Sequence, residues 1–151
     1  MPKQIAAPVL DDAADASHTD VTCTDVSYLD GESYAISVRG HRLVVDQPAE
    51  AGGQDSAPTP TELFVASLAS CVAFYAGRYL DRHGYSRAGL SVSAGFSMAS
   101  GHPARVGSIK LAVQVPASLP APRRAALLAV MSHCTVHNSL VSPPSVTIAL
   151  S

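Results

Sequence analysis

Apolar and polar residues alternate along the first part of the chain, and this period of two predicts β-strands. The first alternating stretch ends at Asp30-Gly31, a dipeptide typical of hairpin turns. Gly40 separates the next two stretches, and a segment rich in Gln, Pro, Gly and Ser follows them, which is typical of a loop. The three predicted strands and the loop are residues 21–30, 34–38, 42–46 and 47–58.

A long helix is predicted after this loop. Thr59-Pro60-Thr61-Glu62 matches the capping box, with Thr59 as N-cap and proline at the first helical position. The pattern continues to about His83 and stops at Gly84. The first half of the helix is apolar nearly all round, which predicts burial on every side, in a larger core or in a dimer. Its uncharged run of about 15 residues is too short to span a bilayer.

The rest of the chain predicts an α+β protein. Two further strands are expected at residues 90–98 and 106–115. A second helix is predicted over 123–131, a short helix over 135–140, and a closing strand over 145–150. Residues 1–18 show no usable period and are expected to form a flexible arm. Residues 19–151 are predicted to form a single domain.

Composition and charge narrow the possible functions. The chain has 151 residues, 47% of them apolar, and a net charge of -2, which gives no basic field for nucleic acid or for an anionic membrane. The N-terminus lacks the apolar stretch of a secretory signal, so we expect a cytoplasmic protein. Three cysteines are too few for a disulfide scaffold, and in the cytoplasm a disulfide is more often transient and catalytic.

Two of these cysteines are candidates for redox chemistry. Cys71 lies about three turns into the long predicted helix, beyond the reach of its N-terminal dipole. Cys134 precedes the short helix, whose free N–H groups favour a thiolate, so local physics ranks Cys134 as the easier thiolate. His133, Cys134 and His137 resemble a zinc motif but have no evident fourth ligand. Cys23 has no identifiable redox partner.

Several motifs along the chain occur together. They are GHRLVVDQP at residues 40–48, Gly52-Gly53, PTPTEL at 58–63 leading to SLASC at 67–71, and CTVHN at 134–138. Together these motifs resemble the OsmC/Ohr family. The resemblance extends from about residue 20 to the C-terminus. It implies an OsmC-like fold, with antiparallel sheets around a long central helix in an intertwined homodimer. It also implies a thiol peroxidase of stress defence that needs no cofactor and no metal.

The resemblance assigns roles to particular residues. Cys71 would attack an organic hydroperoxide, Cys134 would resolve the sulfenic acid as a disulfide, and a dithiol reductant would reset the pair. Family members activate the attacking thiol with an arginine from the early strands, held by a glutamate at the helix start. Candidates here are Arg39 and Arg42 for the arginine and Glu62 for the glutamate. Arg78, on the same helix face as Cys71, is a further candidate for the arginine.

One departure from the family pattern keeps other functions open. The acidic residue that the family has directly after the proline corresponds to Thr61, and Glu62 comes one position later. One residue turns a helical side chain by about 100°. Two alternatives therefore remain beside the peroxidase. The first is a protein that binds a small hydrophobic or acyl ligand, and the second is a redox sensor with little turnover.

Overall fold

A computed structural model describes residues 22–116 and 118–150. The predicted flexible arm lies outside these residues. The described elements are β1 (Thr24–Asp30), β2 (Ser33–Val38), β3 (His41–Val45), η1 (Ala49–Ala51), α1 (Pro60–Arg82), β4 (Ser91–Met98), β5 (Val106–Gln114), α2 (Ala121–Met131) and α3 (Thr135–Val141). They confirm the predicted α+β class and the predicted strand and helix order up to α3.

The strands form two antiparallel sheets, β1-β2-β3 and β4-β5. The β1–β2 hairpin turns at Gly31, with φ of 52°, as the Asp30-Gly31 signal predicts. The β2–β3 hairpin turns at Arg39 and Gly40, which have φ of 46° and 82°. Positive φ at both turn positions is what a tight two-residue hairpin requires.

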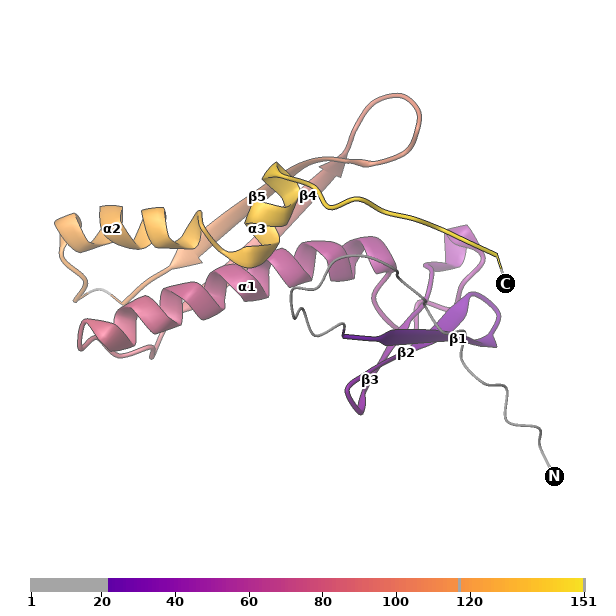
Figure 1. Cartoon of the computed structure of the whole chain (residues 1–151), viewed down its shortest axis with the longest axis horizontal. Coiled ribbons are helices and arrows are strands. Elements are labelled where there is room, and N and C mark those ends of the chain that lie inside the picture. The colour runs from indigo at the N-terminus through magenta and orange to yellow at the C-terminus, as the bar shows by residue number, and fades with distance from the viewer. Residues whose placement is uncertain (1–21, 117, 151) are drawn as a thin grey trace, which may run out of the picture.

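The helix α1 is the axis of the fold (Figure 1), with α2 and α3 along one side and the β1–β3 sheet near its N-terminal end. The capping box is formed as predicted: the Thr59 hydroxyl accepts from the Glu62 N–H, and the Glu62 carboxylate accepts from the Thr59 N–H. The helix ends at Arg82 with His83 as its C-cap, and Gly84 follows with φ of 74°. Local sequence signals therefore determine both ends of this helix.

The main core lies where α1 meets α2, α3 and the β4–β5 sheet. Leu80 and Leu127 are almost fully buried there. By length and composition alone α1 could cross a membrane, since it has 23 residues and a mean hydropathy of 1.4 in its most apolar window. A core helix of a soluble protein passes the same test, and α1 contacts elements on several sides.

The predicted closing strand is absent from the described chain. Residues 143–150 pair with no strand and run away from α3 as an open segment (Figure 1). Val146 and Ile148 are 79% and 90% exposed. The prediction was wrong for this chain because alternation gives a strand only when another strand satisfies its backbone groups.

Candidate functional site

The structure brings Cys71 and Cys134 together. Cys71 is half-buried on α1, and Cys134 is fully buried at the start of α3, which lies against α1. Both belong to the same packed core, and their thiols are close enough for Cys71 to affect the titration of Cys134. All three cysteines of the chain are free thiols. Two free thiols from distant parts of the sequence therefore lie in one core.

Local hydrogen bonds position Cys134. Its backbone N–H donates to the Met131 carbonyl at 3.3 Å, so the cysteine follows directly from the end of α2. Its sulfur caps α3 and accepts from the His137 N–H at 3.4 Å. A cap usually has an oxygen as acceptor, so a sulfur in this position indicates a thiol whose orientation is fixed by the helix.

Burial decides the electrostatics of Cys134. Desolvation raises the pKa of this thiol above its ordinary value, and the neighbouring Cys71 raises it further. The hydrogen bond from the His137 N–H lowers the pKa, but by less than desolvation raises it. The expectation that the helix start favours a Cys134 thiolate is therefore not met, because the cost of burying the charge exceeds the benefit of the helix start. A buried, protonated thiol suits a resolving role better than an attacking one.

Tyr75 connects the two helices that hold the thiols. It lies four residues after Cys71 on α1, and its hydroxyl is 3.2 Å from the Thr135 hydroxyl, beside Cys134. Sequence reasoning missed this contact. The available signal was the spacing, because residues four apart share a helix face. The pair gives α1 and α3 a polar contact next to the dithiol.

The arginines that were predicted to activate Cys71 are all exposed. Arg39 is exposed in the β2–β3 turn, and Arg42 is exposed on β3. Within the described residues the salt bridge between Arg87 and Asp81 is the only one, so neither arginine pairs with Glu62. Arg78 is exposed and stacks over the Phe74 ring, 5.6 Å from its centroid. Among the described residues, therefore, no ion pair joins an early-strand arginine to the glutamate.

Glu62 acts in the capping box. Its carboxylate accepts from the Thr59 N–H at 2.7 Å and from the Thr59 hydroxyl at 3.0 Å. These two hydrogen bonds hold the pKa of Glu62 below its ordinary value. The interactions are those of a helix start, and Thr61, the position that matches the acidic residue of the family, is half-buried.

A groove opens beside the dithiol. It has a volume of about 490 Å³ and includes Leu68, one turn before Cys71, and His137, one turn after Cys134. The remaining walls come from α1, β5 and α3 and are mainly apolar: Phe64, Val106, Ile109, Leu140 and Val141. Arg105 adds a positive charge at the start of β5. The volume and the lining are typical of a site for a small organic molecule.

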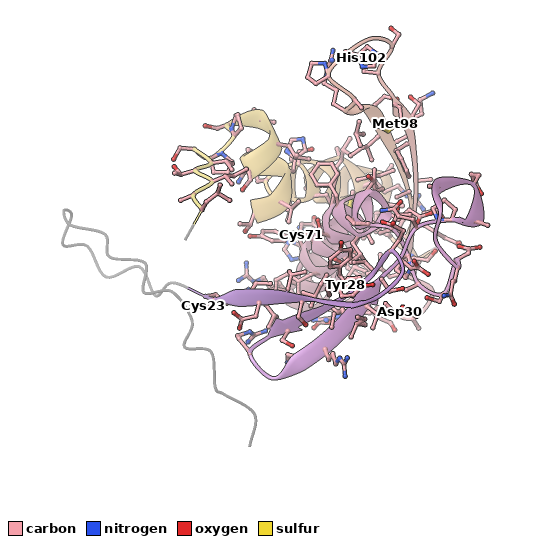
Figure 2. All side chains as sticks on the ribbon, turned by 90° about the vertical axis from the view of Figure 1, so that its right-hand side faces the viewer. Cys23, Tyr28, Asp30, Cys71, Met98 and His102 are labelled. Carbon is pink, nitrogen blue, oxygen red and sulfur yellow. The ribbon has the colours of Figure 1, made fainter. Side chains whose placement is uncertain are left out.

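Two candidates remain, namely the third cysteine, Cys23, and the possible metal ligands around Cys134. Cys23 is exposed just before β1 and lies apart from Cys71 in Figure 2. Over residues 22–116 and 118–150, no three side chains of His, Cys, Asp or Glu gather in a group that could hold a metal ion.

Comparison with known proteins identifies the family. The family model of OsmC-like protein matches residues 53–149, so the chain belongs to the OsmC-like proteins. A comparison with curated proteins found no match.

Solved structures agree on the fold. One of them is described as an osmotic stress induced and detoxification response protein from Psychrobacter arcticus. It superposes on this chain with a TM-score of 0.73 at 22% identity, over 81% of this chain and 90% of that one. The organic hydroperoxide resistance protein OsmC of Legionella pneumophila superposes with a TM-score of 0.63 at 19% identity, over 82% of this chain and 91% of that one. The organic hydroperoxide resistance protein OhrB of Bacillus subtilis superposes with a TM-score of 0.57 at 15% identity, over 80% of this chain and 92% of that one.

Proposed function

We propose that this protein reduces organic hydroperoxides, with Cys71 as the attacking thiol and Cys134 as the resolving thiol. The observation that carries the proposal is that a half-buried thiol on α1 and a buried thiol at the start of α3 belong to the same packed core. Membership of the OsmC-like proteins supports it, because structural relatives include organic hydroperoxide resistance proteins. The expected location is the cytoplasm, where such a dithiol stays reduced between turnovers.

The chemistry needs two thiols and an external reductant. The Cys71 thiolate attacks the outer oxygen of ROOH, the O–O bond breaks, and the product leaves as ROH after taking a proton. Cys71 is then a sulfenic acid. The Cys134 sulfur attacks it, forming the S–S bond, while the hydroxyl leaves with the thiol proton as water. A dithiol reductant reduces this disulfide and is itself oxidised.

The groove favours an organic peroxide over hydrogen peroxide. Its apolar walls gain from covering an alkyl or aryl group, by about 25 cal/mol for each Å² of apolar surface removed from water. Two lining residues support this use of the groove, because Leu68 precedes Cys71 by three positions and His137 follows Cys134 by three.

We also propose a homodimer, which would complete the site. In the single chain Arg39 and Arg42 lie on the β1–β3 sheet without an acidic partner among the described residues. That sheet exposes Val26, Tyr28 and Leu43, at 61%, 62% and 49%. A second copy that covers these apolar side chains would bring an early-strand arginine toward the partner's Cys71.

The test is reaction of reduced protein with cumene hydroperoxide, followed by disulfide mapping. We expect a Cys71–Cys134 disulfide and catalytic consumption of peroxide when a dithiol such as dithiothreitol is present. Cys71→Ser should abolish turnover, whereas Cys134→Ser should allow one oxidation at Cys71 and then stop. Cys23→Ser is the matched control and should keep wild-type turnover. Failure of Cys71 to react faster than free cysteine would overturn the peroxidase proposal.

A second candidate function rests on Glu62. Its carboxylate is engaged by Thr59, and Thr61 stands where the family has an acidic residue. Without a carboxylate to orient the arginine, the chain would bind a small hydrophobic ligand or sense oxidation with little turnover. A stoichiometric Cys71–Cys134 disulfide without catalysis favours the sensor. An unreactive Cys71 together with ligand binding in the groove favours the binding protein.

A further inference from the structure

A second cavity lies along the C-terminal half of α1, and none of its lining residues lines the apolar groove described above. Its volume is about 330 Å³, at the lower end of the range for small-molecule sites. The cavity is lined by Tyr75, Arg78, Tyr79, Arg82, His83 and, from α2, Val130. On α1 these positions recur at the spacing of one helix face, so the lining is a continuous stripe.

The lining of this cavity contains positively charged side chains and no negatively charged one. Arg78 and Arg82 are exposed at its edge, and its lining includes no acidic residue. Neither arginine has an acidic partner among the described residues, because the nearby Asp81 is paired with Arg87. Two guanidinium groups without a counter-ion are the usual protein partners of a carboxylate, which they bind through paired N–H donors.

The floor of the cavity is aromatic. Tyr79 is only 7% exposed, and its ring stacks on His83 with centroids 4.2 Å apart. The Tyr79 hydroxyl is buried and has no hydrogen-bond partner among the described residues. Buried polar groups of folded proteins are nearly always paired. Tyr75 and Val130 add half-buried side chains to the lining, so a ligand would meet both aromatic rings and positive charge.

We propose that this cavity binds a small aromatic carboxylate. Arg78 and Arg82 hold the carboxylate, and the rings of Tyr75 and Tyr79 pack against the aromatic body. A simple inorganic anion would use the charge but leave the aromatic floor uncovered. A neutral aromatic compound would cover the floor but leave both arginines unpaired. The site uses neither thiol, so it does not depend on the proposed peroxidase function.

The experiment is a ¹⁹F NMR titration of the full chain with 4-fluorobenzoate. Two probes separate the contributions: 4-fluorobenzyl alcohol keeps the ring without the charge, and fluoroacetate keeps the charge without the ring. We expect 4-fluorobenzoate to bind more tightly than either probe, by roughly tenfold or more. Equal affinity for fluoroacetate would overturn the aromatic part of the proposal, and equal affinity for the alcohol would overturn the carboxylate part.

Variants locate the binding on this stripe. Arg78→Ala with Arg82→Ala should weaken 4-fluorobenzoate by at least about tenfold, and the matched control Arg123→Ala, an exposed arginine of α2 outside the cavity, should leave it unchanged. Circular dichroism checks that each variant is folded. Cys71→Ser should bind as the wild type does, so failure of the peroxidase proposal and failure of this one are distinguishable. Binding that survives loss of both arginines, or no binding by the wild type, overturns the proposal.

Discussion

Two residues fix the loop that leads into α1. The Asp46 carboxylate is fully buried and accepts hydrogen bonds from the N–H groups of Gln47, Gln54 and Ser56 and from the Ser56 hydroxyl, at 2.7 to 3.2 Å. Gly53 lies against the same turn, where a Cβ would come within 1.8 Å of the Gln47 carbonyl oxygen. The loop is therefore folded around one carboxylate and depends on the absence of one side chain.

Gly53→Ala should destabilise the protein severely, because the clash involves backbone, which cannot move aside cheaply. We expect soluble yield or the melting temperature to fall well below the wild type. Gly95→Ala is the matched control, since a Cβ there meets nothing within 4 Å. Equal melting temperatures for the two variants would show that the loop relaxes around an added methyl group.

Asp46 predicts an acid-sensitive stability. Hydrogen bonds from the Ser56 hydroxyl and N–H, above all, hold the pKa of Asp46 well below its ordinary value. A depressed folded pKa means that the stabilisation is complete above the unfolded pKa of about 3.9 and is lost as pH falls toward the folded value. Melting temperatures measured from pH 5 to pH 2 should fall less steeply for Asp46→Asn than for the wild type. Parallel curves would contradict this role.

The roles of two residues, Asp46 and Cys134, could not be predicted from the sequence. Asp46 was predicted to end a strand, and only the nearby Gly52-Gly53 pair indicated a tight loop. The acceptor geometry of a carboxylate depends on donors eight and ten residues away, which no local pattern encodes. The pKa of Cys134 was misjudged for the same reason, because burial by other elements decides it.

At the scale of elements, α1 is specified by its own sequence. Proline at the first position, the Thr59–Glu62 pair and Gly84 after the end give both boundaries without reference to the rest of the fold. The open segment 143–150 is the opposite case, because a strand requires a neighbour and none of the described strands pairs with this segment. Helices and hairpins with local signals were predicted, whereas pairing between distant segments was not.

The capping box at the start of α1 should contribute measurably to stability. Thr59→Ala should lower the free energy of unfolding by about 1 kcal/mol, because the Glu62 N–H loses its acceptor. Thr59→Ser keeps a hydroxyl and should restore most of that loss. Urea denaturation measures both changes. Ser70→Ala, whose exposed hydroxyl bonds within the helix, is the control and should cost little or nothing. A neutral Thr59→Ala would mean that tertiary packing alone sets the helix start.

At the scale of the whole molecule, the described residues leave many large apolar side chains exposed. The exposed apolar side chains occur on β1, on β3, on α1 and on the C-terminal segment, and include Val26, Tyr28, Leu43, Phe74, Val146 and Ile148. Exposed apolar side chains mark an interaction site when they form a contiguous patch. The proposed homodimer accounts for them and for the unpartnered closing segment together.

The C-terminal segment provides the test of this assembly. Light scattering should give twice the chain mass of 15.6 kDa for the wild type. Because side chains alternate across a strand, Val146→Asp with Ile148→Asp should shift the protein toward monomer. Ser145→Asp with Thr147→Asp changes the same charge on the opposite face and should shift it less. A monomeric wild type, or equal effects of the two variants, would rule out strand addition through this face.

The contact between Tyr75 and Thr135 gives the molecule an optical property. The chain contains no tryptophan, so its ultraviolet emission comes from five tyrosines. Tyr75 is the one whose hydroxyl meets the residue next to Cys134, one helical turn from Cys71. If the proposed Cys71–Cys134 disulfide shifts α3 against α1, the surroundings of that phenol would change. The tyrosine emission would then report the oxidation without a label.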